Sequence, residues 1–133
     1  SGAVRNEKYQ KFQTFFKTVY EKNLEGSSSS ILSVWHPNDR EEVNQLMDDA
    51  SLKKNQDRFK AIDKWQMIKI VQYGDYYICF VAMEIKPQPA YVMKYPVIGF
   101  DGELYLTNSL NGNYFYDMIS HYLDETNFSN IPN

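Results

Sequence analysis

The sequence contains few of the residues that build disulfides and metal sites. Of its 133 residues, one is a cysteine, Cys79, and two are histidines, His36 and His121. A single cysteine cannot form an internal disulfide, and it excludes a zinc site built within this chain from four cysteines or from two cysteines and two histidines. Cys79 lies in a run of β-branched and aromatic residues, so we expect it to pack as a small hydrophobic side chain. We expect no metal and no cofactor.

Other signals that would indicate a function are also missing. No apolar run approaches the roughly 18 residues of a membrane helix, so we expect no membrane span. The net charge is −3 and no basic stripe or tail is present, which argues against nucleic acid as a partner. The glycine-rich loops that cradle nucleotide phosphates and the G-x-S-x-G nucleophile motif are absent as well.

Aromatic residues, in contrast, are abundant. They make up 16% of the chain, with 11 tyrosines and 8 phenylalanines. Aromatic side chains bury large areas, and tyrosine keeps a polar tip, so this composition suits a tyrosine-lined pocket or interface. A genome that favours Tyr, Asn and Lys codons would give the same composition. The length suits one domain that buries roughly two-thirds of its unfolded surface.

The composition at the two ends predicts the domain limits. Residues 1–4 are expected to be the remnant of a cleaved tag and a disordered start, because Ser1-Gly2-Ala3 resembles such a remnant. Residues 5–125 are expected to form a single α+β domain, and the polar residues 126–133 a flexible tail. A removed signal peptide would leave no trace, so an exported (periplasmic or secreted) location and a cytoplasmic one both stay open.

Hydrophobic periodicity predicts helices at both ends of the domain. Residues 5–24 carry an apolar stripe at helical spacing that Gly26 is placed to end. A second helix is expected over 39–54, with Asn38 as its N-cap and Glu41 completing a capping box. A third amphipathic pattern predicts a C-terminal helix over 113–124.

Between these helices, alternating β-branched and aromatic residues predict four strands over 59–72, 76–85, 90–100 and 103–107. Gly74-Asp75 joins the first pair, and Asp101-Gly102 predicts a type I′ turn with positive φ at both positions. The predicted fold class is therefore α+β, with N-terminal helices packed on a bent four-stranded antiparallel meander and a C-terminal helix. Both sheet faces are apolar, so each must be buried against other parts of the structure. We expect helices to cover one face, and the second face to enclose a cavity, receive the last helix or form a homodimer.

Four segments carry a resemblance to a known superfamily: the Tyr9–Val19 pattern, residues 59–63, the hairpin around residues 73–77 and the stretch 102–107. This layout resembles the cystatin-like or nuclear-transport-factor-like cone superfamily. The resemblance implies a fold that hosts isomerases, hydrolases and many non-catalytic binding or dimerisation modules, so it does not choose a function. The predicted terminal helix departs from the many members that end on a strand.

Two residues are candidates for catalysis. Asp63, in the first predicted strand, could act as a general base with tyrosine donors nearby, although a surface aspartate paired with a lysine is the simpler interpretation. His36 could act as a base or a ligand together with Asp39, although a histidine at the start of a helix is commonly structural. The aromatic residues that could line a ligand pocket, or pack as core or dimer interface instead, are Trp65, Tyr76, Tyr91, Tyr95 and Tyr105.

The sequence favours a small non-enzymatic binding or protein-interaction module that dimerises through its sheet. Its partner would be a small apolar ligand or a protein segment. One alternative is a cone-pocket enzyme of isomerase or hydrolase type, which needs a large pocket with a catalytic base. Another is an inhibitor or immunity-type protein that acts through an exposed loop such as residues 86–90. We expect a filled or narrow cone with no base inside.

Overall fold

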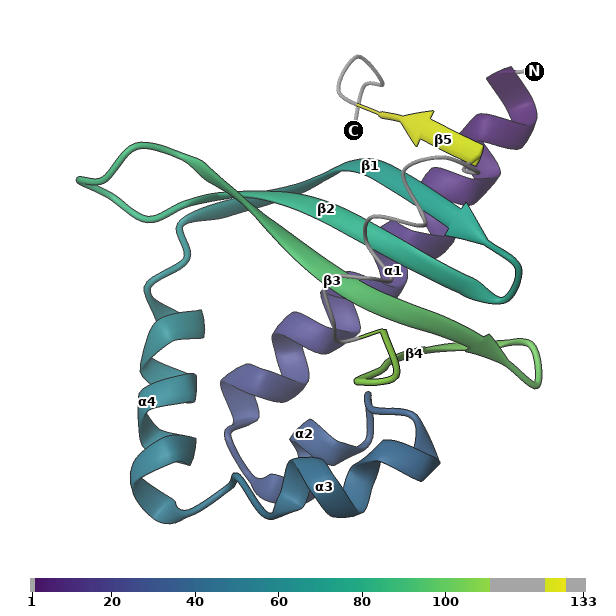
Figure 1. The fold of residues 1–133 in the computed structure, drawn as a ribbon. Helices are drawn as coiled ribbons and strands as arrows, with labels where there is room; N and C mark the ends of the chain where they lie inside the picture. The colour runs from purple at the N-terminus through teal and green to yellow at the C-terminus, as the bar shows by residue number, and fades with distance from the viewer. Residues whose placement is uncertain (1, 111–123, 129–133) are drawn as a thin grey trace.

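The computed structural model describes residues 2–110 and 124–128. It confirms the predicted α+β class, with helices that precede an antiparallel sheet (Figure 1). The elements are α1 (Gly2–Glu25), α2 (Ser28–Leu32), a short 3-10 helix η1 (Pro37–Asp39), α3 (Arg40–Asn44), α4 (Asp49–Lys60), β1 (Lys64–Tyr73), β2 (Tyr76–Glu84), β3 (Tyr91–Phe100), β4 (Glu103–Leu106) and β5 (Asp124–Asn127).

The sheet contains the predicted four-stranded meander and one additional strand. Its order is β4-β3-β2-β1-β5, and every pairing is antiparallel. The register of β1 against β2 shifts between Met67 and Lys69, which is a β-bulge. A bulge bends and twists the strand that contains it, and the sheet is strongly twisted in Figure 1.

The tight turns follow the glycine signals in the sequence. Asp101 has φ 53° and Gly102 has φ 76°, so the predicted positive φ at both positions between β3 and β4 is confirmed. Gly74, in the turn between β1 and β2, has φ 58°. Gly26 has φ 82° and follows the last residue of α1, as predicted for a glycine that ends a helix.

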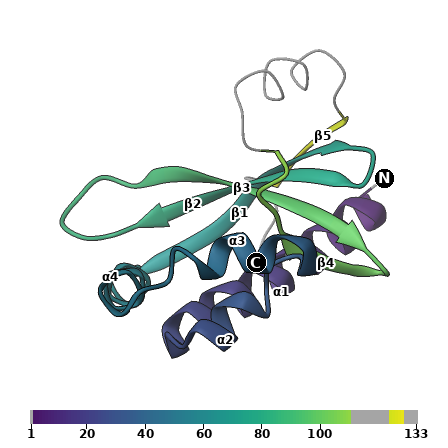
Figure 2. The ribbon, with the colours of Figure 1, turned by 60° about the horizontal axis from the view of Figure 1, so that its bottom comes forward.

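The helices α1 to α4 lie on one side of the sheet, which we call the inner face (Figure 2). Helix α1 lies along this face, and its stripe Tyr9, Phe12, Phe16 and Val19 is buried. Cys79 is buried here as a small hydrophobic side chain, as predicted, and burial raises the pKa of its thiol. The inner-face side chains of the strands are Trp65, Met67, Ile70, Tyr77, Cys79, Val81, Met83, Tyr91, Met93, Tyr95, Val97, Leu104 and Leu106.

The opposite side of the sheet, which we call the outer face, has less cover from the residues that the structure describes. Leu110 packs on Val71 and Ile78 and forms a small buried cluster there. Two large apolar side chains farther along the face, Val92 and Phe100, remain 48% and 47% exposed. The predicted C-terminal helix lies outside the described residues, apart from Asp124, which begins β5 instead.

The predicted second helix was wrong in its limits. The segment 39–54 is divided between η1, α3 and α4, because the Asp48 carboxylate accepts a hydrogen bond from the Ser51 backbone N–H at 2.7 Å and starts a new helix. Helix α4 then continues to Lys60, so Phe59 is its buried anchor and not the start of a strand. The predicted cap was also wrong: the His36 ring, not Asn38, provides the side-chain cap of η1.

The described helices and strands extend past both ends of the range 5–125. Residues 2–4 belong to α1, and residues 124–127 form β5 along the edge of β1. Phe128 follows this strand and is fully buried; its N–H donates to the Ile68 carbonyl at 2.7 Å, and its ring centroid lies 5.3 Å from that of Tyr9. Phe128 is therefore part of the core, and edge pairing joins the preceding polar residues to the sheet.

The burial of Phe128 gives a direct test of the C-terminal strand. Phe128→Ala removes a fully buried ring, so we expect it to lower the free energy of unfolding by about 3–5 kcal/mol in chemical denaturation. Phe100→Ala, at a ring that is 47% exposed, is the matched control and should change stability by less than about 1 kcal/mol. Equal effects of the two substitutions would show that the C-terminal strand is not packed on the core.

Candidate functional site

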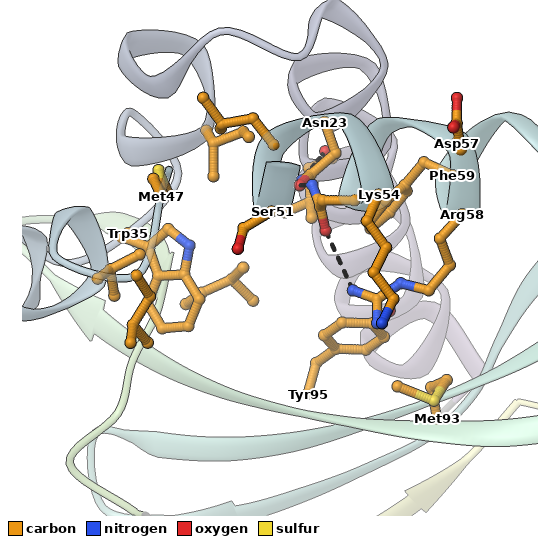
Figure 3. Close-up of a pocket in the computed structure, with 17 residues that line it drawn as sticks. Asn23, Trp35, Met47, Ser51, Lys54, Asp57, Arg58, Phe59, Met93 and Tyr95 are labelled. Atoms are coloured by element: carbon orange, nitrogen blue, oxygen red, sulfur yellow. Dashed lines mark hydrogen bonds between the residues drawn. The ribbon is translucent and has the colours of Figure 1, made fainter. Parts of the chain in front are cut away.

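A pocket with a volume of about 850 Å³ lies between the helices and the inner face (Figure 3). This volume falls within the range of small-molecule sites. The expectation of a filled or narrow cone was therefore wrong. The apolar lining comprises Val19, Ile31, Trp35, Val43, Leu46, Met47, Leu52, Phe59, Met93 and Leu106. The polar lining comprises Asn23, Ser51, Lys54, Asn55, Asp57, Arg58 and Tyr95.

Hydrogen bonds between α1 and α4 position the helical wall of this pocket. The Asn55 side-chain amide donates to Asn23 Oδ1 at 2.7 Å, and the buried Asn23 donates to the Val19 carbonyl at 2.7 Å. The next residue of α4, Gln56, donates to the Leu24 carbonyl at 2.8 Å. These bonds satisfy polar groups at the C-terminal end of α1 and hold α4 at that end.

Tyr95 of β3 forms part of the opposite wall. Its ring centroid lies 5.1 Å from that of Phe16, which fixes the ring against α1. Burial raises the pKa of Tyr95 to about 12, although the positive charge of Arg58 acts in the opposite direction. The hydroxyl is therefore protonated at neutral pH and able to donate a hydrogen bond. Within residues 2–110 and 124–128, no protein group accepts that hydrogen bond.

Trp35 reaches the pocket because its backbone extends the sheet beyond β4. The Leu106 N–H donates to the Val34 carbonyl at 2.8 Å, and the His36 N–H donates to the Leu106 carbonyl at 2.9 Å. Successive side chains of an extended segment point to opposite faces. Trp35 accordingly lines the pocket, and its ring nitrogen points toward the interior in Figure 3, while His36 lies on the other side.

Three charged residues of α4 lie at the edge of the pocket. The Asp57 carboxylate lies 2.7 Å from the ammonium of Lys53, a residue that is not part of the pocket lining. Arg58 donates to Asn55 Oδ1 at 3.1 Å and lies over the Phe59 ring, with its guanidinium carbon 6.0 Å from the ring centroid. Lys54 and Arg58 extend toward the wall formed by Tyr95 in Figure 3. Neither cation has a carboxylate partner in the part of the chain that the structure describes.

The described lining contains no histidine and only one carboxylate, that of Asp57, which is exposed and already paired. A general base must lie within hydrogen-bond reach of the proton that it removes. The arrangement therefore supports binding through apolar contacts and hydrogen-bond donors more than it supports proton transfer.

The two catalytic candidates from the sequence lie outside this pocket. Asp63 is exposed, and its carboxylate lies 3.5 Å from the ammonium of Lys86; it borders a separate, shallower hollow of about 460 Å³. His36 is buried, its Nδ1 accepts from the Asn38 N–H at 3.2 Å, and its ring packs on Phe100 and Tyr105. Each of the two side chains interacts with another part of the protein, and the structure does not bring them together.

Of the five aromatic residues proposed to bind a ligand, only Tyr95 lines the large pocket. Trp65 and Tyr91 pack in the core on the inner face. Tyr76 and Tyr105 lie on the outer face, where Tyr105 contacts the His36 ring. Alternation along the strands explains this separation, since neighbouring positions on a strand face opposite sides of the sheet.

Sequence reasoning missed the contributions of Trp35 and of α4. Ser51, Lys54, Asn55 and Arg58 recur at intervals of three or four residues, which places them on one face of a helix. That spacing is visible in the sequence, but only if the helix is extended to Lys60. The position of Trp35 depends on the bridge to Leu106, for which the sequence carries no local signal.

The described residues contain no group of three or more His, Cys, Asp or Glu side chains arranged to hold a metal ion. No helix among them has the length and apolar character needed to cross a membrane.

Comparisons with known proteins do not assign the chain to a family. No protein-family model matches the sequence, and no curated protein matches it significantly.

The raised pKa of Tyr95 predicts a spectroscopic signature. Between pH 10 and about 12 the unfolded chain ionises this hydroxyl and the folded chain does not, so this group lowers stability as the pH rises through that interval. In ultraviolet titration of tyrosinate, the difference between the native protein and Tyr95→Phe should show a group that titrates near pH 12. Tyr73→Phe, at an exposed ring, is the control substitution. A difference spectrum for Tyr95→Phe that titrates near pH 10 would contradict the burial of this hydroxyl.

Proposed function

We propose that this chain is a small non-enzymatic binding module that takes a small apolar molecule in the pocket between α4 and β3. The observation that carries this proposal is an apolar pocket of about 850 Å³ that opens to the surface; its described lining contains no histidine, and its one carboxylate, Asp57, is already paired with Lys53. Leu46 is 70% exposed, and Met47, Leu52 and Met93 are only partly buried, so a ligand that covers these side chains would be stabilised by their burial. The resemblance to the cone superfamily supports the same proposal, because that layout hosts many non-catalytic modules.

The two alternative functions explain less of the structure. A cone-pocket isomerase or hydrolase requires an acid or base near its ligand, and Asp63 and His36 both lie elsewhere. An inhibitor or immunity-type protein would use the exposed residues 86–90, which form the end of the hairpin between β2 and β3 that projects from the sheet in Figure 1. That function accounts for the loop but gives the pocket no role.

Binding of a neutral apolar dye tests the proposed function. Nile red should bind the native protein with an increase in fluorescence, and Ser51→Trp should weaken this binding about tenfold or more by filling the pocket. Ser51 lines the pocket with an exposed side chain, and only its backbone N–H is needed for the Asp48 cap. Tryptophan and serine have similar helix propensities, so the fold should persist.

Lys60→Trp is the matched control, because Lys60 is exposed on the same helix and lies outside the pocket lining. It should leave dye binding unchanged, while circular dichroism verifies the helix content of both variants. Absence of dye binding to the native protein, or equal binding by native protein and Ser51→Trp, would reject the proposed function.

We further propose that the chain forms a homodimer through its outer face. Val92 and Phe100 are exposed there, and the half-buried Phe80 lies on the same face. The ammonium groups of Lys69 and Lys94 lie 5.0 and 5.7 Å from the centroid of the Phe80 ring. In a two-fold dimer the same patch meets itself, so these like charges would approach one another and weaken the association at low salt.

The dimer proposal therefore predicts an unusual response to salt. In light scattering at high micromolar protein concentration, the dimer fraction should rise as sodium chloride increases from about 0.05 to 0.5 M, because salt screens the lysine charges. Val92→Glu should abolish the dimer, and Leu46→Glu, at an apolar residue that is 70% exposed on the helical side, should not. A monomer at every salt concentration would reject the dimer.

A further inference from the structure

We infer that the ligand of this pocket is an amphipathic carboxylate, with its anionic group between Lys54, Arg58 and Tyr95 and its apolar part against the helices. This inference rests on the proposed binding function and adds the chemical class of the ligand. It follows from which polar groups of the lining are already engaged by the protein and which are not.

The acceptor oxygens of the lining side chains are largely occupied. Asn23 Oδ1 accepts from Asn55 at 2.7 Å, and Asn55 Oδ1 accepts from Arg58 at 3.1 Å. Asp57 Oδ1 accepts from the Lys53 ammonium at 2.7 Å. A ligand that presented mainly hydrogen-bond donors would therefore compete with bonds that the protein has already formed, and would gain little.

Several hydrogen-bond donors of the lining, in contrast, have no acceptor within the described part of the chain. Among the described residues, the Trp35 ring N–H, the Tyr95 hydroxyl and the Lys54 ammonium have no hydrogen-bond acceptor in the protein. The Trp35 nitrogen points toward the pocket interior, and Lys54 extends toward Tyr95 (Figure 3). A donor that stays unpaired when a ligand displaces its water carries a desolvation penalty, so a bound ligand must supply acceptors.

The charge at the edge of the pocket indicates that the acceptor is an anion. Lys54 and Arg58 are four residues apart on α4, so they lie on one face of the helix and their like charges repel. Their neighbour Asp57 does not offset this repulsion fully, because it is paired with Lys53. A carboxylate placed here would accept charge-assisted hydrogen bonds, and the planar guanidinium of Arg58 can contact both of its oxygens.

The rest of the pocket requires an apolar group on the same ligand. The rest of the lining is mainly apolar, with side chains such as Leu46, Met47 and Leu52. Methionine side chains adapt to ligands of different shape, which suits a flexible alkyl chain or an aromatic ring. A multiply charged phosphate fits this lining less well, because only the two cations of α4 would compensate its charge and the remaining lining is mainly apolar.

Competition between two ligands of equal chain length tests the inference. Decanoate and decanol differ in the charge of the head group, and decanoate is ionised at neutral pH. We expect decanoate to displace Nile red from the native protein at a concentration at least about tenfold lower than decanol at low ionic strength. Raising the salt concentration should reduce this preference, because salt screens the cations of α4.

A double substitution identifies the groups responsible. Lys54→Gln/Arg58→Gln should reduce the preference for decanoate over decanol to less than about threefold. The matched control is Lys17→Gln/Lys60→Gln, which removes the same charge at exposed residues outside the lining and should keep the preference. If the double variant loses dye binding as well, the single variant Lys54→Gln becomes the test of the preference for decanoate. The Lys54 side chain forms no hydrogen bond or ion pair within the described residues, so its replacement should leave the fold intact.

The outcomes separate this inference from the proposed function. Equal displacement by decanol and decanoate, displacement by neither, or a preference that survives Lys54→Gln/Arg58→Gln would overturn the carboxylate inference while leaving an apolar binding pocket. Failure of the native protein to bind Nile red, decanol or decanoate would overturn both. A preference lost only in the Lys54/Arg58 variant would support both.

Discussion

Phe16 packs edge-on against Trp65, with ring centroids 4.7 Å apart, and lies 5.1 Å from the ring centroid of Tyr95. These contacts join α1 to β1 and to β3 at once. Aromatic pairs of this geometry add stabilisation beyond the area that they bury. Together with Phe12 on Tyr77 and Tyr9 on Phe128, they fix the direction of α1 along the inner face. The positions of the remaining helices depend on this direction.

Because α1 is fixed in this way, its C-terminal end determines where α4 can lie. Asn23 and the Leu24 carbonyl provide the hydrogen bonds that hold α4 there, and Phe59 secures the other end of α4 in the core. The inner-face residues Met93, Tyr95 and Leu106 then face α4 across the pocket. The pocket is thus a consequence of how two helices are joined, and residues far apart in sequence form its walls.

Local signals in the sequence predicted the parts of the fold that local interactions determine. The stripe Tyr9 to Val19, the stop at Gly26 and the turn at Asp101-Gly102 all depend on neighbouring residues, and each was confirmed. The new start at Asp48 was missed because the apolar pair Leu46-Met47 continues the helical pattern across it. Strand β5 was missed because Asp124–Asn127 is polar and has low strand propensity; it forms by pairing with the edge of β1.

The same distinction applies to the candidate site. Tyr95 could be predicted because aromatic residues in an apolar strand commonly face a core or a pocket. Lys54 and Arg58 could not be recognised while the helix was expected to end at residue 54, since their shared face exists only in a helix that continues to Lys60. Trp35 enters the lining through a single bridge to Leu106, a non-local contact. Asp63 and His36 were chosen for their chemistry, but both lie outside the pocket: Asp63 is exposed beside Lys86, and the His36 ring accepts from the nearby Asn38 N–H.

The cations on the two sides of the sheet have different surroundings. On the outer face Lys69 and Lys94 lie over the ring of Phe80, whose negative face offsets part of their charge and shields the apolar surface beneath. In the pocket, Lys54 extends beside apolar side chains without such a partner among the described residues. An anion that reaches Lys54 and Arg58 brings charge compensation that the protein does not itself supply. The outer face offers mainly contact area, and its lysines oppose the approach of a second copy. Selectivity for a ligand can therefore arise in the pocket from charge as well as from shape.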